Sequence, residues 1–348
     1  MRIPMIDWLK QSKQFPQLYW KPRDTNACLA ATGKGSFAPF YVAPFSSMNA
    51  PLWSSFSHQR TFAFEQVRTG KQASYEKRLV TPRIRQINYS PTFEEWNHSI
   101  LLAKKEIERG SFNKIVLARK VEIVLESPID PLEILQSNLF AANLYGFYFS
   151  PKKGTAFLGA SPERLVKQCG DLVQTEALAA TRKQGQEQEL FQKSKEQREF
   201  RCVEVAIEKA LLSYVRNLKS SKITLKKSHN LFHLRKKFQG DLITQTSLKS
   251  LVNRLHPTPA ILGENTPYTW QFLQKHEPFE RGLYAGVFGP QEAEKADLCV
   301  PIRSCLIEEN SLQLFSGAGI VLESDPLKEW QELDDKLAPY LELLCLSL

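Results

Sequence analysis

Short apolar runs, broken repeatedly by Gly, Pro, Ser and Asn, are the feature that most constrains the fold of this 348-residue chain. Runs such as FYVAPF at 40–45 and FAFEQV at 62–67 are typical of strands bounded by turns. From about residue 90 onward, segments with apolar residues at helical spacing alternate with such runs. No Rossmann glycine signature accompanies them. The pattern predicts a single α+β domain in which strands and helices are interleaved.

Five segments are predicted to be helical. The first opens at Ser90-Pro91-Thr92, where Glu95 completes a capping box, and it ends at Gly110. The other four are expected at 131–144, 196–215, 268–275 and 325–344. A strand is expected to begin at Lys114, between the first two helices.

The charge pattern leaves three kinds of partner open. A net charge of +9 is compatible with nucleic acid, an anionic membrane surface or a small anionic substrate. Much of this charge lies between Arg216 and Lys237, a stretch without acidic residues that we call the basic run. Because no nucleic-acid motif or aromatic stripe accompanies the basic run, we expect a solvated loop and strand edge, and no nucleic-acid partner.

The N-terminal stretch and the cysteines argue against further classes of protein. Asp7, Lys10 and Lys13 interrupt the first apolar stretch, so neither a signal peptide nor a membrane span is predicted, and we expect a cytoplasmic protein. The six cysteines show no C-x-x-C spacing, which argues against a zinc site and against a disulfide framework.

Two Glu-x-x-Glu pairs, Glu196/Glu199 and Glu329/Glu332, lie in predicted helices. Either pair taken alone is typical of a solvated helix face. If the two pairs converge, they could instead hold a hard cation, because Mg²⁺ prefers oxygen ligands and usually takes one or two protein carboxylates together with substrate oxygens. Spacing alone leaves both interpretations open.

Three further features also have two interpretations each. Lys114, at the head of an apolar strand, either reaches outward to solvent or enters a pocket where its pKa would be lowered. Glu163 follows the apolar run AFLGA, so it either carries chemistry in an apolar environment or lies in a surface turn beside Arg164. The small residues Gly317, Ala318 and Gly319 either let backbone N–H groups approach an anion or form a tight turn with positive φ.

Ordered segments over nearly the whole chain resemble the chorismate-utilising enzymes, which include isochorismate, salicylate, anthranilate and aminodeoxychorismate synthases. The segments are FPQLYWKPRD, NKIVLAR, FLGASPERL, TEALAATR, KEQREF, LHPTPA, ERGLYAGVFG, PIRS, SGAGIV and SDPLKEWQELDDK. Within the family, the lysine of NKIVLAR together with TEALAATR and LHPTPA is similar to isochorismate synthases of the menaquinone and plant types.

The resemblance implies a fold and an activity. It implies large antiparallel sheets flanked by helices, with residues 1–89 as scaffold strands of the same domain and residues 90–348 as the chorismate-binding catalytic region. It also implies Mg²⁺-dependent conversion of chorismate to isochorismate, by attack of water at C2 and loss of the C4 hydroxyl. A monomer without an amidotransferase subunit is expected.

The resemblance also implies roles for individual residues. Lys114 would be the general base and Glu163 the general acid. Glu199 and Glu332 would bind Mg²⁺ directly, with Glu196 and Glu329 as their outer partners. The substrate would be bound by residues from five segments: Ala180, Thr181, His233, Arg303, Gly317, Ala318, Gly319 and Lys336. Ala180 departs from the family pattern, which has glycine at this position.

Two alternatives to isochorismate synthase remain. A salicylate synthase would share Lys114, Glu163 and the four glutamates, and would also remove pyruvate from isochorismate. A non-catalytic basic protein that binds a ligand or nucleic acid is the alternative from another class.

Overall fold

The computed structural model describes residues 4–46, 52–63, 82–136, 143–228, 231–244, 246–264 and 266–343. Its strands form one 16-stranded sheet in the order β10-β12-β9-β8-β14-β13-β2-β1-β6-β7-β15-β16-β5-β4, with β11 paired to β12 and β3 to β2. All the strand pairs described are antiparallel, which confirms the expected α+β fold with a large antiparallel sheet.

The strands of the N-terminal half are β1 (Gln17–Lys21), β2 (Ala27–Ala43), β3 (Leu52–Ala63), β4 (Ile84–Ser90), β5 (Ile115–Leu125), β6 (Tyr145–Lys152), β7 (Thr155–Ser161) and β8 (Arg164–Cys169). Those of the C-terminal half are β9 (Leu172–Lys183), β10 (Val215–Ser220), β11 (Thr224–Ser228), β12 (Leu231–Leu242), β13 (Val287–Pro290), β14 (Lys295–Cys299), β15 (Ser304–Glu308) and β16 (Ser311–Ile320). The helices are α1 (Met5–Gln11), α3 (Phe93–Glu108), α4 (Pro131–Gln136), α5 (Glu189–Gln192), α6 (Ser194–Leu212), α7 (Leu248–Leu255), α8 (Pro267–His276) and α9 (Pro326–Leu343).

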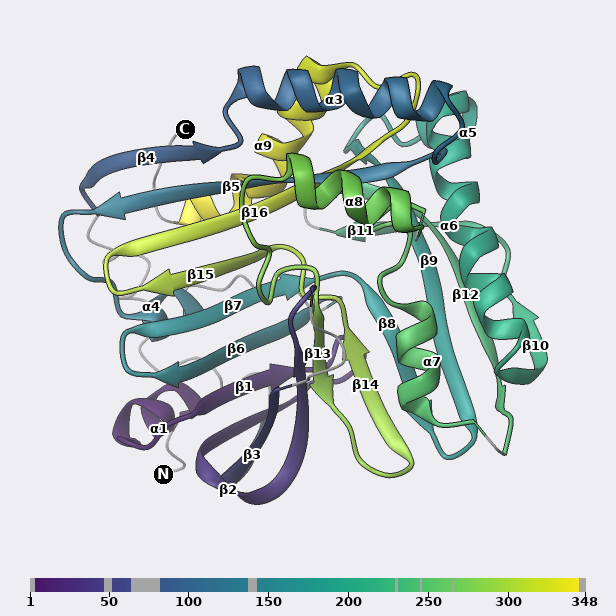
Figure 1. Cartoon of the computed structure of the whole chain (residues 1–348). Helices are drawn as coiled ribbons and strands as arrows, with labels where there is room; N and C mark the ends of the chain where they lie inside the picture. The colour runs from purple at the N-terminus through teal and green to yellow at the C-terminus, as the bar shows by residue number, and fades with distance from the viewer. Residues whose placement is uncertain are drawn as a thin grey trace.

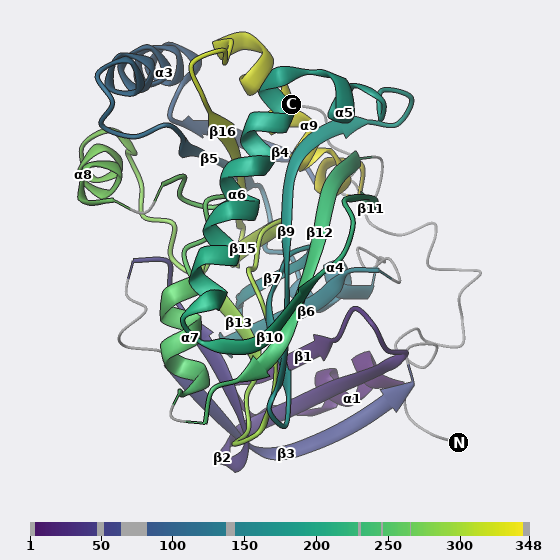
Figure 2. The same ribbon diagram turned by 90° about the vertical axis from the view of Figure 1, so that its right-hand side faces the viewer.

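The sheet changes direction along its length. In Figure 1, strands β4, β5, β16, β15, β7, β6 and β1 run across the view, whereas β8, β9, β12 and β14 run down it. Helices α6 and α7 lie along the face of the second group, α3 lies above the first group in Figure 1, and α9 lies behind it, as Figures 1 and 2 both show. The two groups of strands therefore meet at an angle.

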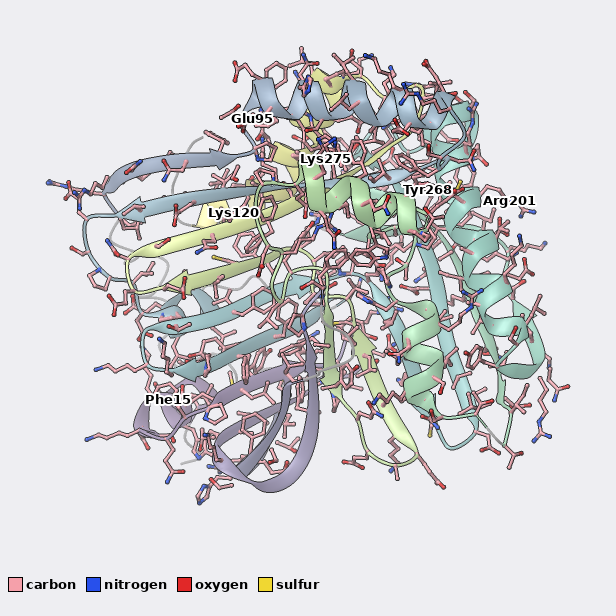
Figure 3. All side chains as sticks on the ribbon, in the orientation of Figure 1. Phe15, Glu95, Lys120, Arg201, Tyr268 and Lys275 are labelled. Carbon is pink, nitrogen blue, oxygen red and sulfur yellow. The ribbon has the colours of Figure 1, made fainter. Side chains whose placement is uncertain are left out.

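The first predicted helix forms as expected. The Glu95 amide donates to Thr92 Oγ1 at 3.3 Å, and the Thr92 amide donates to Glu95 Oε2 at 2.9 Å, which completes the capping box. Glu95 lies at the end of α3 nearest β4 (Figure 3). Trp96 and Ile100 are fully buried on one face of α3, because they are spaced four residues apart.

The helix predicted at 131–144 is described as α4 from Pro131 to Gln136. Residues 137–142 lie outside the described residues, and Asn143 and Leu144, which precede β6, are not helical, so the predicted C-terminal end of the helix is wrong. Part of the predicted strand at 62–67 also lies outside them, because β3 is described only to Ala63.

The segment SGAG is part of a strand, so the tight-turn interpretation is wrong. Gly317 and Gly319 lie within β16, opposite Ala118 and Val116 of β5, and neither has a positive φ. Because both residues lack a Cβ, neighbouring side chains can pack closely against this part of β16.

Strands from both sequence regions share the sheet. β1 pairs with β6, and β2 pairs with β13. The separate roles assigned to residues 1–89 and 90–348 stay predictions. Among the described helices, none is long and apolar enough to span a membrane.

Candidate active site

A small cavity of about 80 Å³ is lined by residues of β5 and β16, from the first group of strands, and of β9 and β12, from the second. Most of the residues singled out from the sequence line it: Glu163, Ala180, Thr181, Glu199, His233, Arg303, Gly317, Gly319 and Lys336. Thr181 also lines a wider cleft of about 960 Å³ that contains Glu196, Glu329 and Glu332. Ala318 does not line the cavity and is buried in the hydrophobic core, because successive residues of a strand face opposite sides.

Lys114 lies immediately before β5 and is fully buried, so its side chain does not reach outward to solvent. Its Nζ is 3.2 Å from Glu199 Oε1, near the start of α6. A Cβ on Gly319 would lie 2.8 Å from both Lys114 Cε and Glu199 Oε1. Glycine at this position of β16 therefore makes room for the Lys114–Glu199 pair.

Glu163 lies between β7 and β8 and is only 5% exposed, so the surface-turn interpretation is wrong. Burial raises the pKa of its carboxyl to about 7, and the negative charge of Glu176 acts in the same direction. Thr258 Oγ1 donates a hydrogen bond to Glu163 Oε1 at 3.2 Å. Glu163 can therefore keep a proton near neutral pH and deliver it into the cavity.

His233 and Arg303 offer donors to a ligand. His233 Nδ1 lies 3.0 Å from Thr181 Oγ1, and its buried Nε2 has no hydrogen-bond partner among the described residues. Burial lowers the pKa of His233 well below its usual range, which keeps the imidazole neutral. The Arg303 guanidinium forms no ion pair within the described parts of the chain, although it lines the cavity.

Lys336 joins α9 to the cavity wall. Its Nζ donates to the Gly317 carbonyl and to Glu332 Oε1, both at 2.7 Å. The ammonium group thus lies between the backbone of β16 and one of the acidic pairs.

Three non-glycine residues of the cavity wall have a left-handed backbone: Ala180 with φ 58°, Ala285 with φ 62° and Arg303 with φ 53°. At Ala180 the cause is a bulge, since His233 and Leu234 of β12 face Thr181 and Ala179, which leaves Ala180 unpaired. Strained backbone of this kind is concentrated at binding and catalytic sites.

None of the four glutamates lies on a fully exposed helix face. Glu196 and Glu329 are each 1% exposed, whereas the side chains of Glu199 and Glu332 keep 19% and 24% of their surface. Each carboxylate forms an ion pair with a basic side chain: Glu196 with Arg182, Glu199 with Lys114, Glu329 with Lys195 and Glu332 with Lys336.

Lys195 indicates that the acidic pairs converge. Burial acts to lower the pKa of Lys195, but the charges of Glu329, Glu199 and Glu332 outweigh it and raise the pKa. The charges of three carboxylates therefore reach one ammonium group, which forms an ion pair with Glu329. Carboxylate oxygens are the ligands that a hard dication prefers. Within the described residues, no three acidic, histidine or cysteine side chains are already arranged as ligands of one metal ion.

Four residues of the site were not singled out from the sequence: Arg182, Lys195, Thr258 and Tyr284. All four lie inside the segments that carried the family resemblance. Their position in those segments was the only sequence signal that could have pointed to them. Tertiary packing is needed to show which residues of a segment lie at the site.

A family model described as "Chorismate binding enzyme" matches residues 46–345. The isochorismate synthase MenF of Haemophilus influenzae is 28% identical over 384 residues, covering 98% of this chain and 89% of that protein. MenF of Escherichia coli is 35% identical over 258 residues, covering 72% of this chain and 60% of that protein. The solved structure of the menaquinone-specific isochorismate synthase MenF from E. coli superposes with a TM-score of 0.82 and 25% identity, over 98% of this chain and 91% of that one. The chain belongs to the chorismate binding enzyme family.

Proposed function

We infer that this protein is an isochorismate synthase, which adds water at C2 of chorismate while the C4 hydroxyl departs as water. The observation that carries the proposal is the buried Glu163 carboxyl, whose pKa is raised to about 7 and which lines the same cavity as Glu199, the ion-pair partner of Lys114. The matching relatives that bear the name isochorismate synthase support it.

Glu163 is proposed as the general acid. Its apolar surroundings keep the carboxyl neutral, and Thr258 holds one oxygen so that the other can face the substrate. Protonation of the C4 hydroxyl would make water the leaving group.

Lys114 is proposed as the general base for the attacking water. Lys114 lies close enough to Glu163 for the charge of the lysine to lower the pKa of the Glu163 carboxyl. The two groups are therefore near enough to act on the same substrate molecule. Gly319 makes room beside β16 for the Lys114 side chain and its Glu199 partner.

The remaining cavity residues are proposed to bind chorismate. Among the described residues, Arg303 has no carboxylate partner and His233 Nε2 is a buried polar group without a hydrogen-bond partner, so both could bind a substrate carboxylate or hydroxyl. Thr181 orients His233, and Lys336 places its positive charge at the cavity wall. The backbone at Ala180, Gly317 and Gly319 would contact the ring and the enolpyruvyl group closely.

Mg²⁺ is the proposed cofactor, with Glu199 and Glu332 as direct ligands. These two carboxylates keep exposed surface, whereas Glu196 and Glu329 are buried against Arg182 and Lys195 and suit an outer role. When bound, the ion would neutralise the acidic pairs and fix the carboxylate on the substrate ring.

Incubation of the protein with chorismate and Mg²⁺, followed by chromatography of the products, tests the proposal. Isochorismate is expected. Salicylate together with pyruvate would favour the salicylate synthase alternative. DNA binding with a steep salt dependence and no turnover would favour the non-catalytic alternative. A cytoplasmic, monomeric enzyme without an amidotransferase subunit stays a prediction.

A further inference from the structure

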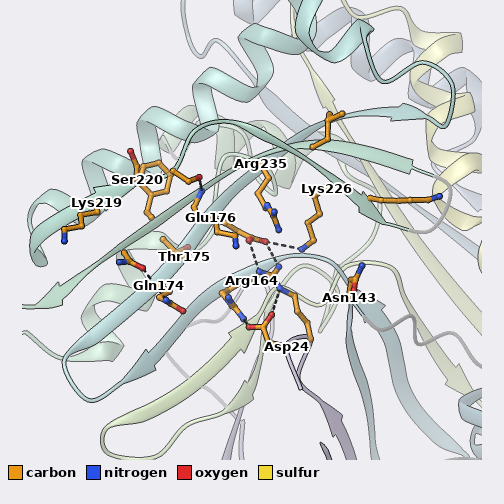
Figure 4. A pocket seen from close by; sticks show the side chains of 17 residues that line it. Asp24, Asn143, Arg164, Gln174, Thr175, Glu176, Lys219, Ser220, Lys226 and Arg235 are labelled. Carbon is orange, nitrogen blue, oxygen red and sulfur yellow. Dashed lines mark hydrogen bonds and ion pairs between the residues drawn. The ribbon is translucent and has the colours of Figure 1, made fainter. Parts of the chain in front are cut away.

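A second cavity, of about 710 Å³, lies beside β9, β11 and β12 (Figure 4). It shares no lining residue with the cavity that contains Glu163. Five of its basic side chains come from the basic run: Lys219, Lys226, Lys227, Arg235 and Lys237. We call it the basic pocket. The basic run is therefore not only a solvated strand edge, since Lys226 is 6% exposed.

Positive charge in the basic pocket exceeds negative charge. Seven basic residues and two acidic residues line it, which leaves an excess of five positive charges. Both acidic residues are already engaged, Glu176 with Arg23 and Lys226, and Asp24 with Arg164. Lys219, Lys227, Arg235 and Lys237 have no acidic partner among the described residues, which leaves their charge uncompensated.

Arg235 points its guanidinium toward Lys226 and Glu176 (Figure 4). Its buried Nε has no hydrogen-bond partner within the described part of the chain. Burial lowers the pKa of Lys226 to about 8, and the charges of Arg23 and Arg235 act in the same direction. An anion seated here would give Arg235 a partner and relieve the repulsion among the cations.

The basic pocket also contacts the backbone that carries Glu163. Arg23 Nη1 donates to the Pro162 carbonyl at 3.0 Å, and Lys226 Nζ donates to the same carbonyl at 2.5 Å. Both side chains also hold Glu176, at 2.8 Å and 3.3 Å. An anion that draws Lys226 away from Pro162 would remove one of the two hydrogen bonds that hold the residue directly before Glu163.

We propose that the basic pocket binds a small anion with carboxylate or phosphate groups, and that the bound anion lowers turnover by withdrawing Lys226 from Pro162. The effect on turnover rests on the proposed function, whereas the binding itself does not. The geometry predicts a lower kcat with little change in the KM for chorismate, because the pocket lies outside the substrate cavity.

Calorimetric titration of the metal-free protein with inorganic phosphate, and separately with succinate, tests the binding. Saturable binding is expected for the wild type, and Arg235→Gln should weaken it roughly tenfold, since one charge-assisted partner is lost. The matched control is Arg216→Gln, which removes the same charge from an exposed residue of β10 outside the pocket and should leave the affinity unchanged. Absence of saturable binding, or equal affinities of the two variants, would overturn the proposal.

Turnover of chorismate in the presence of the better-binding probe tests the coupling. The wild type and Arg216→Gln should lose kcat several-fold, and Arg235→Gln should lose much less. A probe that raises KM alone would be binding in the substrate cavity, which contradicts the coupling. If no variant converts chorismate, the proposed function fails, while the titrations still decide whether the basic pocket binds anions.

Discussion

Replacement of Glu163 by glutamine should have two opposite effects: it should lower turnover and raise the stability of the folded protein above neutral pH. Glutamine has nearly the same shape and can still accept the hydrogen bond from Thr258. It cannot ionise and is a poor proton donor. We therefore expect turnover to fall about 10²-fold or more, and stability above neutral pH to rise.

The size of the stability change follows from the pKa of Glu163. The pKa is raised from 4.5 to about 7 in the folded protein. Because the folded pKa is the higher one, the stabilisation of the protonated form is complete below about pH 4.5 and is lost as the pH rises through 7. The span of about 2.5 pH units, at 1.36 kcal/mol per unit, corresponds to roughly 3 kcal/mol.

Urea unfolding of wild type and Glu163→Gln at pH 5 and pH 8 measures this difference. The free energy of unfolding of Glu163→Gln minus that of the wild type should be roughly 2 to 3 kcal/mol larger at pH 8 than at pH 5. Glu108→Gln, at an exposed carboxylate of α3, is the control and should show no such pH dependence. Equal gains of Glu163→Gln at both pH values would refute the argument that burial keeps this carboxyl protonated.

Four further predictions concern the cavity. Lys114→Gln should reduce isochorismate formation by about 10²-fold or more while the near-ultraviolet circular dichroism spectrum is retained, and full activity would remove Lys114 from the mechanism. Ala180→Gly should raise stability by up to about 1 kcal/mol in thermal unfolding, because the residue has φ 58°; a destabilised variant would argue against backbone strain. Gly319→Ala should cost about 1–3 kcal/mol and most of the activity, since its Cβ would lie 2.8 Å from Glu199 Oε1, and a silent substitution would contradict that packing. Mg²⁺ should raise the melting temperature of the wild type but much less that of Glu332→Gln, and equal shifts would place the ion elsewhere.

Local sequence signals determined the helices at the edge of the fold. The capping box of Thr92 and Glu95 fixed where α3 begins, because both hydrogen bonds are made within four residues. The periodic apolar residues Phe200, Val203 and Ile207 fixed the buried face of α6 in the same way. Family motifs then led to Lys114, which neither charge nor spacing could select.

What the sequence alone determined was therefore local: helix faces, a cap, and an ordered set of motifs with their expected roles. Tertiary structure decided the environment of each charged group. Spacing places Glu196 and Glu329 on helix faces but does not say what covers those faces, and only packing against Arg182 and Lys195 shows both carboxylates buried. The same limit applies to Lys226, which belongs to a run of basic residues in the sequence and lies buried beside Glu176. The two residues are 50 positions apart and come together because β12 pairs both with β11, which carries Lys226, and with β9, which carries Glu176.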